Sequence, residues 1–411
     1  MKPGFLLNAV VLGTLGLAAC GAIDADRQDA AFADHADVRI VTTPETILDQ
    51  IPVVTLDAPP SLIVGSALGS DEQLLHRIAG VARLPNGHIV VANGGNTDVR
   101  WYDSSGRFVR SAGRFGSGPG EFASFMLTLQ TLDPDTLIIH DMVAGRMTYF
   151  AFDGELLGTR SLPDRLSGFV GLVAGNRAVV AAPETETRTV PSLGTVHRPF
   201  FVRTIDLDTG APDTIVELEA APELWHQRGE RIIISRVPFT VYPAVAAGES
   251  RIAIVDGRSY EVRLYDGDGH LSAIHRLGLD PSPVRPGEYR EAVEAEINAG
   301  PEADHADLAR LFRSAPMPQT VPTFDAVMLD ARGSVWAGHY PAPRDTFKTW
   351  TVFDSSGDAI FRVRTPIGLR LRHVTDDLLL GTYIDDSGVE YVHGYKLDLP
   401  VIGGVSAGSP P

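Results

Sequence analysis

Apolar and polar positions follow a four-part pattern that recurs along most of the chain. In the clearest copy, short and mainly apolar runs cover Val81–Leu84, His88–Ala92 and Val99–Tyr102, and a fourth short run, Arg107–Ser111, contains Phe and Val; turn residues lie between them. Short runs bounded by Gly, Asn and Asp are typical of β-strands. The pattern therefore predicts a unit of four antiparallel strands.

Five weaker copies follow the first. Their second strands are predicted at Thr136–Ile139, Ala178–Ala181, Arg251–Val255, Ser334–Trp336 and Leu378–Leu380. A single four-stranded sheet cannot bury both of its faces, whereas six such sheets arranged radially can. The expected fold class is therefore all-β, a six-bladed β-propeller over residues 46–400.

The sixth copy lacks an outer strand, because the chain runs out after Pro400. An apolar run near the other end, Leu62–Gly65, belongs to none of the six copies. We expect this N-terminal strand to complete the last blade, since that would remove an exposed sheet edge.

The Asp and Gly residues that recur in the turns have a structural explanation. Glycine supplies the positive φ that tight hairpin turns need, and an Asp side chain caps such a turn. We therefore expect Asp103, Asp266 and Asp354, which precede turns of this kind, to be structural rather than catalytic.

Three segments carry the most specific sequence signals: Asn86–Asn93, Val99–Asp103 and Gly116–Phe122, the last reading Gly-Ser-Gly-Pro-Gly-Glu-Phe. They resemble NHL-type repeats, and the match is best with the six-bladed propeller lipoproteins of bacteria. The resemblance covers roughly residues 60–155, and elsewhere only the spacing supports it. It implies the same six-bladed fold.

Connections between the predicted strands differ between the two faces of the ring. The turns from first to second strand and from third to fourth strand are short. The opposite face, here called the long-loop face, carries Arg114–Phe125, Pro183–Pro199, Glu219–Tyr242, Asp280–Phe324 and Tyr340–Lys348. Because long loops on a rigid scaffold usually hold binding residues, we expect the functional site on this face.

The longest connection, residues 280–324, has helical periodicity. Tyr289, Val293 and Ile297 fall on one face of a helix that begins near Pro286 and ends before Gly300. A second short helix would carry Leu308, Leu311 and Phe312. Two arrangements are open: a flap over the mouth of the central channel, or a decoration packed on the side of one blade.

The first twenty residues have the layout of a secretory signal, with Lys2 before the uncharged apolar stretch Phe5–Leu17. The Leu-Ala-Ala-Cys run ending at Cys20 resembles the lipobox of bacterial lipoproteins. This resemblance implies removal of residues 1–19, lipidation of Cys20 and attachment to a membrane through that lipid. The alternative is an ordinary signal peptide with a chance cysteine, or a helix that is not cleaved.

Other features of the termini extend this interpretation. Residues 20–45 are expected to be a flexible tether, and residues 401–411 a disordered tail. Gly21, rather than Asp, after the cysteine favours the outer membrane in bacteria that sort by this position. The expected location is therefore the bacterial cell envelope.

Composition narrows the class of protein. The chain has 411 residues, 44% of them apolar and 21% charged, which fits a globular fold. The net charge of −17 argues against nucleic acid as a partner. Cys20 is the only cysteine, so no disulfide can form within the chain.

Polar residues at the ends of the predicted second strands are candidates for the channel: Asn93, His140, Asp141, Glu184, Asp256 and His339. Three or more of them meeting at the axis could bind Ca²⁺ or Zn²⁺; otherwise they line a wet channel. Arg77, Arg370 and Arg372 precede or enter inner strands and could face an anionic ligand, or lie solvated at the rim.

No His-Glu-x-x-His motif is present, and no catalytic residue is assigned. The expected function is recognition of an envelope protein, peptide or glycan on the long-loop face. The alternative is a metal-dependent lyase or lactone hydrolase with an axial metal, activities found among propellers related to NHL repeats. Three converging His, Asp or Glu side chains would favour the enzyme.

Overall fold

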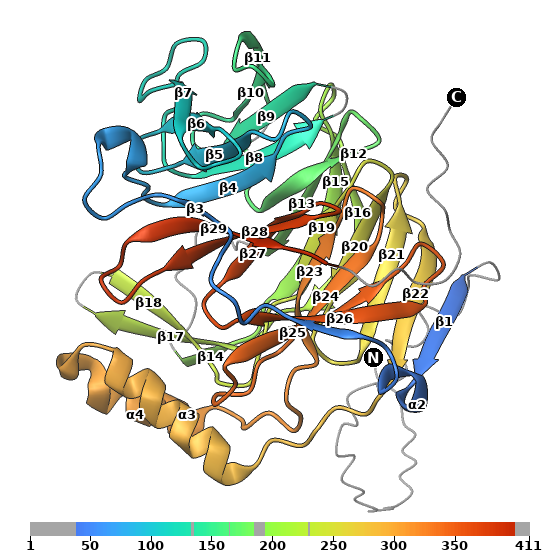
Figure 1. Cartoon of the computed structure of the whole chain (residues 1–411). Coiled ribbons are helices and arrows are strands. Elements are labelled where there is room, and N and C mark those ends of the chain that lie inside the picture. Colours follow the sequence, from blue (N-terminus) through green and yellow to red (C-terminus); the bar gives the residue numbers. More distant parts are fainter. Residues whose placement is uncertain (1–37, 133–134, 164, 185–193, 229–230, 399–411) are drawn as a thin grey trace, which may run out of the picture. The chain divides into compact units, whose positions relative to one another are not determined.

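The computed structural model describes residues 38–132, 135–163, 165–184, 194–228 and 231–398 (Figure 1). One compact unit begins at Arg39. It contains six sheets in which four antiparallel strands follow one another from the inside outwards, and we number these blades in chain order. The predicted six four-stranded units are confirmed.

The strands of the six blades are as follows. Blade 1 has β4 (Ile78–Arg83), β5 (Ile89–Asn93), β6 (Asp98–Tyr102) and β7 (Phe108–Ala112). Blade 2 has β8 (Leu127–Leu132), β9 (Thr136–Asp141), β10 (Arg146–Ala151) and β11 (Leu156–Ser161). Blade 3 has β12 (Phe169–Val173), β13 (Arg177–Pro183), β15 (Pro199–Asp206) and β16 (Pro212–Glu219). Blade 4 has β19 (Ala244–Ala247), β20 (Arg251–Val255), β21 (Glu261–Asp266) and β22 (Leu271–Gly278). Blade 5 has β23 (Phe324–Leu329), β24 (Val335–His339), β25 (Phe347–Phe353) and β26 (Ala359–Pro366). Blade 6 has β27 (Arg370–Val374), β28 (Leu378–Ile384) and β29 (Glu390–Lys396).

Neighbouring blades pack through their apolar faces and close into a ring. The first strands of blades 1 to 5 contact one another in order, and β27 of blade 6 contacts β4 of blade 1. Blades 5 and 6 share a buried cluster in which Trp336 packs with Val374 and Leu379. The protein is therefore a six-bladed β-propeller, as the sequence predicts.

An N-terminal strand completes the last blade. Strand β3 (Leu62–Val64) pairs antiparallel with β29, and Ile63 lies opposite His393. Leu62 and Val64 are buried between blades 6 and 1. The predicted closing strand is confirmed.

The chain enters the fold earlier than the sequence suggests. Strand β1 (Arg39–Pro44) pairs parallel with β22, and β2 (Val53–Thr55) pairs parallel with β26, so both are fifth strands on the outer edges of blades 4 and 5. Helix α2 (Glu45–Leu48) joins them and buries Leu48. The tether predicted over residues 20–45 is therefore too long, because the unpaired edge of β22 orders residues 39–45. The predicted signal peptide, Cys20 and the tail over 401–411 lie outside the described residues.

Turn residues act as predicted. The carboxylate of Asp103 accepts hydrogen bonds from the Ser105 hydroxyl and from the backbone N–H groups of Ser105 and Arg107, and Gly106 has φ +83°. These hydrogen bonds lower the pKa of Asp103 below its ordinary range. The equivalent Asp354 accepts the same pattern of bonds, so both residues stabilise hairpin turns.

Two insertions enlarge the crossovers of blades 3 to 5. Between blades 3 and 4, β17 (Glu223–Arg228) and β18 (Arg231–Arg236) form a small sheet with β14 (Gly194–Val196). Between blades 4 and 5 lie α3 (Pro286–Ala299), a short 3₁₀ turn η2 (Glu302–Asp304) and α4 (His305–Ser314), as predicted. Another 3₁₀ turn, η1 (Asp71–Gln73), precedes blade 1. Within the described ranges, no helix is long and apolar enough to cross a membrane.

The helical insertion packs on this small sheet. Leu308 and Phe312 of α4 are buried against Leu224 of β17 and Val237, which follows β18. In Figure 1 the two helices lie beside β14 and β17 at the lower left. The two insertions therefore pack together as one layer, and the helices lie on this layer rather than on the side of a blade.

Candidate functional site

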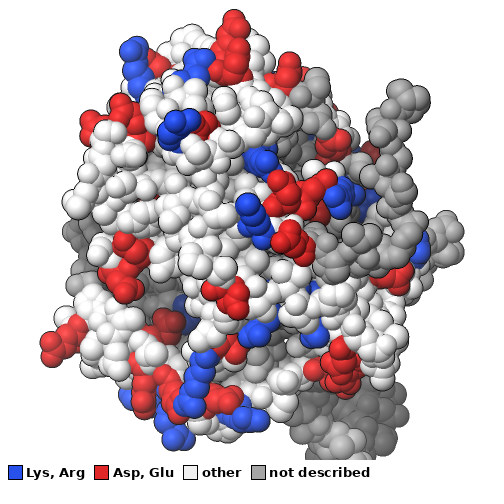
Figure 2. All heavy atoms as spheres, in the orientation of Figure 1, with Lys and Arg blue, Asp and Glu red and all other residues white. Residues whose placement is uncertain are grey.

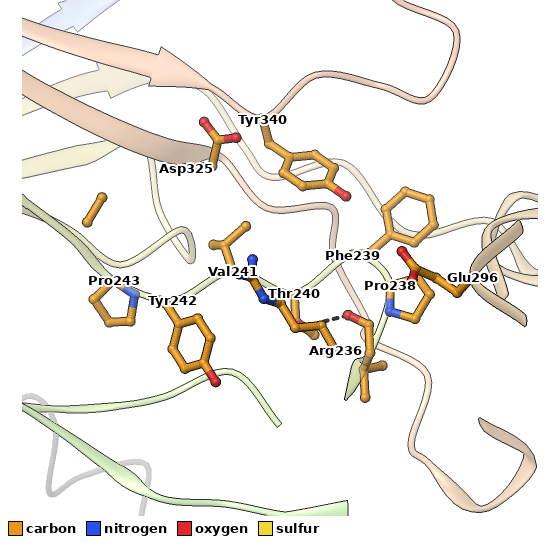
Figure 3. A pocket seen from close by; sticks show the side chains of 12 residues that line it. Arg236, Pro238, Phe239, Thr240, Val241, Tyr242, Pro243, Glu296, Asp325 and Tyr340 are labelled. Carbon is orange, nitrogen blue, oxygen red and sulfur yellow. Dashed lines mark hydrogen bonds between the residues drawn. The ribbon is translucent and has the colours of Figure 1, made fainter. Parts of the chain in front are cut away.

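A cavity of about 400 Å³ opens on the long-loop face between blades 4 and 5 (Figure 3). Ala244 at the start of β19, Asp325 near the start of β23 and Tyr340 just after β24 border it. First strands begin and second strands end on this face. The loop of residues 237–243, Arg236 of β18 and Glu296 of α3 complete the lining.

Helix α3 borders this cavity and is linked to blade 5. Arg344, in the connection between β24 and β25, lies 3.4 Å from Glu291 of α3. Figure 2 shows acidic and basic side chains side by side over the lower part of the view, where α3 and α4 lie in Figure 1. Because Glu296 reaches the cavity, the insertion lies at its rim. Movement of the insertion as a flap stays a prediction.

Asp325 and Lys348 form an ion pair beside the cavity. Asp325 occupies a β-bulge, where β23 has one residue more than its partner strand; bulges of this kind re-aim side chains and occur near active sites. The Nζ of Lys348 donates to the Asp325 carboxylate, and both side chains are about four-fifths buried. Burial raises the pKa of Asp325, and the charge of Lys348 opposes this shift.

A glycine between the two residues makes this ion pair possible. Lys348 lies on the third strand of blade 5 and Asp325 on the first, so the lysine must pass over β24. A Cβ atom at Gly338 would lie 2.8 Å from Lys348 Cε and 3.0 Å from Trp350 Cζ3. Gly338 therefore leaves the space that the lysine stem occupies.

One wall of the cavity is aromatic and contains a strained residue. Phe239 has φ +59°, a conformation that bulky side chains rarely adopt and that is found at binding sites. Its ring centroid lies 6.2 Å from that of Tyr340. The hydroxyl of Thr240 donates to the carbonyl of Val237 at 2.6 Å, which braces the loop. Burial, and to a smaller extent the charge of Asp325, raise the pKa of Tyr340.

A chain of contacts supports Arg236 on the other side of the cavity. The guanidinium of Arg236 lies 5.2 Å from the ring centroid of Tyr242, a cation–π distance. The hydroxyl of Tyr242 donates to Glu223, a carboxylate that is only 3% exposed. Glu223 also receives two hydrogen bonds from Arg198, at 2.7 and 3.1 Å, and one from Trp225. The buried carboxylate thus fixes the ring on which Arg236 rests.

Two charged side chains in the lining are left unpaired. Arg236 and Glu296 are exposed, and within the described part of the chain neither side chain makes a hydrogen bond or an ion pair. By contrast, Lys348 balances Asp325. The cavity therefore presents one free cation and one free anion near three aromatic rings.

The candidates on blades 1 and 2 have structural roles. Asn93 is fully buried, accepts from the His76 backbone N–H at 2.9 Å and donates to Asp98 at 3.0 Å. Asp141 is also fully buried and accepts backbone hydrogen bonds from residues 123, 143 and 144. His140 is 2% exposed and packs against Phe169, and burial lowers its pKa to about 4.

Of the three remaining candidates, His339 and Asp256 contact other side chains of the protein, whereas Glu184 is exposed. The Nε2 of His339 lies 2.8 Å from the Thr351 hydroxyl, and its ring packs against Phe324. Burial lowers the pKa of His339 to about 4. Asp256 pairs with Arg263 at 3.1 Å, and Glu184 is exposed beyond the end of β13.

The arginine candidates remain accessible. Arg77 is exposed with φ +53°, and its guanidinium lies 4.1 Å from the ring centroid of Phe125. Arg372 occupies a β-bulge in β27, and its Nε lies 3.3 Å from the Thr382 hydroxyl. Arg370, on the same strand, is exposed. Neither Arg77 nor Arg372 lines the cavity, so their role in binding an anion stays a prediction.

The predicted polar residues do not come together. Among the residues that the structure describes, no three His, Cys, Asp or Glu side chains form a group that could hold a metal ion. The arrangement required for an axial Ca²⁺ or Zn²⁺ site is therefore not found in the described ranges.

Comparison with known proteins supports the fold. A family model described as "DUF5128: 6-bladed beta-propeller" matches residues 69–178. No curated protein matches the chain. Solved structures resemble it at low identity. One is a protein described as exported from Bacteroides fragilis, with 12% identity, TM-score 0.45 and coverage of 87% of this chain and 100% of that one.

Two further solved structures also resemble the chain at low identity. A member of the DUF4221 family from Bacteroides vulgatus has 10% identity and TM-score 0.47, and covers 82% of this chain and 97% of its own. Regucalcin, described as a calcium-binding protein from Agrobacterium tumefaciens, has 13% identity and TM-score 0.32, with coverages of 84% and 96%. Likenesses this weak carry no argument about function.

Sequence reasoning missed the residues of the cavity. The segment Glu219–Tyr242 was expected to be a loop, but it contains β17 and β18. The runs Glu223–Arg228 and Arg231–Arg236, separated by two residues that include Gly229, are a hairpin signal. That signal would have indicated an ordered structure leading directly to Arg236.

Proposed function

We propose that this protein is a lipid-anchored recognition module of the bacterial cell envelope that binds a peptide, glycan or protein partner on its long-loop face. The observation that carries the proposal is the cavity between blades 4 and 5, with free charges and aromatic rings in its lining. Ligand sites combine an apolar or aromatic lining with a few placed polar groups. The alternative of a metal-dependent lyase or lactone hydrolase would need three converging metal ligands, and the described residues form no such group.

The site can be tested by hydrogen–deuterium exchange on the full chain in detergent. Envelope extract would be separated into peptide, glycan and protein fractions and added to the protein. We expect one fraction to slow exchange in residues 237–243 and in α3. The variant Ala244→Trp, which fills the cavity, should abolish this effect. Ala331→Trp, at an exposed turn on the opposite face, is the matched control.

The exchange experiment has outcomes that would contradict the proposed site. Protection that survives in Ala244→Trp, or that no fraction produces, would contradict binding in this cavity. Because a tryptophan in β19 could disturb folding, the exposed Arg236→Ala provides a second variant, and both should keep the thermal transition of the unmodified chain.

The lipid anchor rests on the sequence around Cys20 and is tested separately. Mass spectrometry of the N-terminal peptide should show a mature chain that begins at Cys20 and carries acyl groups. Cys20→Ala should remain unacylated and leave the membrane fraction. A chain that begins elsewhere without acyl groups would contradict lipid anchoring.

A further inference from the structure

The charges in the cavity narrow the class of ligand. Among its lining residues, Arg236 contributes a free positive charge and Glu296 a free negative charge, whereas Asp325 is balanced by Lys348. Because both side chains are exposed, a ligand with a single charge would pair with one of them, leave the other hydrated and gain only one charge-assisted interaction. A ligand with one charge of each sign would satisfy both.

The free cation is also held in place before any ligand binds. Tyr242 positions the guanidinium of Arg236, and the buried Glu223 holds the Tyr242 hydroxyl. A guanidinium binds a carboxylate through two parallel hydrogen bonds, so orientation matters for this interaction. Holding the side chain in advance lowers the ordering cost of binding. This arrangement favours a carboxylate as the group opposite Arg236.

We infer that the cavity binds a zwitterionic ligand, a free amino acid or short peptide with unblocked ends, with its carboxylate on Arg236 and its ammonium group near Glu296. This inference rests on the proposed function and specifies its ligand. Phe239, Tyr242 and Tyr340 supply apolar surface for the part between the two charged ends. A cavity of about 400 Å³ has room for a small ligand of this kind.

The test uses the full chain in detergent and a mixture of all dipeptides made from the common amino acids. Equilibrium dialysis followed by mass spectrometry identifies the bound peptides, and the same mixture is prepared with N-acetylated or with C-amidated ends. We expect retention of free-ended dipeptides, and at least tenfold weaker binding when either end is blocked. This factor corresponds to the loss of one charge-assisted interaction.

Substitutions at Arg236 and Glu296 test which of these residues binds each end of the peptide. Arg236→Gln should weaken binding about tenfold and make free and C-amidated peptides bind equally, while N-acetylation still weakens binding. Glu296→Gln should remove the effect of N-acetylation only. Arg313→Gln and Glu294→Gln change exposed charges outside the lining and should leave the affinities unchanged.

Other results would overturn the inference in distinguishable ways. Equal binding of free and blocked peptides would refute the zwitterion but leave a peptide site. Retention of neutral oligosaccharides, lost in Ala244→Trp, with no retention of dipeptides would refute the inference while the proposed function stands. If neither class is retained and no envelope fraction protects residues 237–243, both proposals fail.

Discussion

Closure of the ring by β3 leads to a quantitative prediction about Leu62. This side chain is 7% exposed and packs in a cluster with Leu75, Ile78 and Tyr102, at the junction of blades 6 and 1. Replacing a buried leucine by alanine costs about 2–5 kcal/mol. A folded unit of roughly 360 residues has an unfolding entropy of about 0.8 kcal/mol/K, so Leu62→Ala should lower Tm by about 3–7 °C.

The neighbouring Ile63 is the matched control, because it lies on the same strand but is 51% exposed. Ile63→Ala should change the free energy of unfolding by no more than about 0.5 kcal/mol and Tm by less than about 1 °C. Thermal unfolding followed by circular dichroism, at equal protein concentrations, measures both. Equal shifts in the two variants would refute the view that β3 belongs to the cooperative core.

Two further predictions concern packing and pH. Gly338→Ala should destabilise the protein by about 1–3 kcal/mol, because its Cβ would displace Lys348. Gly287→Ala, which has open space around it in α3, should be neutral or stabilising. Urea denaturation of the two variants measures this difference in the free energy of unfolding. His140 and His275 have pKa values lowered to about 4 by burial. Above pH ~6.5 both histidines are neutral in the folded and in the unfolded chain. Below pH ~6.5 they take up protons in the unfolded chain but stay neutral in the folded chain. Stability should therefore fall as pH drops from about 7 to 5, and His140→Phe should flatten the slope of unfolding free energy against pH; an unchanged slope would contradict the assignment.

Local chemistry explains why the fold was predictable. Each blade repeats the same turn requirements, so residues such as Asp103 and Gly106 mark hairpins wherever they recur. The closing strand Leu62–Val64 could be found because the sixth unit lacked a partner for its outer edge. The fifth strands β1 and β2 were missed because they pair with blades far away in sequence, and no local pattern reports such a partner.

The site is less predictable from the sequence, because a position at the end of a strand does not determine which groups a side chain contacts. Asn93 and Asp141 do lie at strand ends, but their side chains accept hydrogen bonds from backbone N–H groups of the adjacent crossovers and of the loop between β9 and β10. Asp325 was missed because a bulge, which the sequence does not reveal, determines its placement. Strand position alone therefore does not distinguish a channel residue from a cap.

Closure of the ring explains why the blades are regular and the crossovers between them are not. Every blade must present matching faces to two neighbours, which restricts the residues between the turns and leaves the crossovers free to vary. The two largest departures from the repeat, residues 219–242 and 280–324, flank blade 4 and meet at one cavity. They also hold the strained Phe239, the unpaired Arg236 and the unpaired Glu296. Because groups that cost stability persist where function requires them, the junction of these two crossovers is the part of the long-loop face where binding is expected.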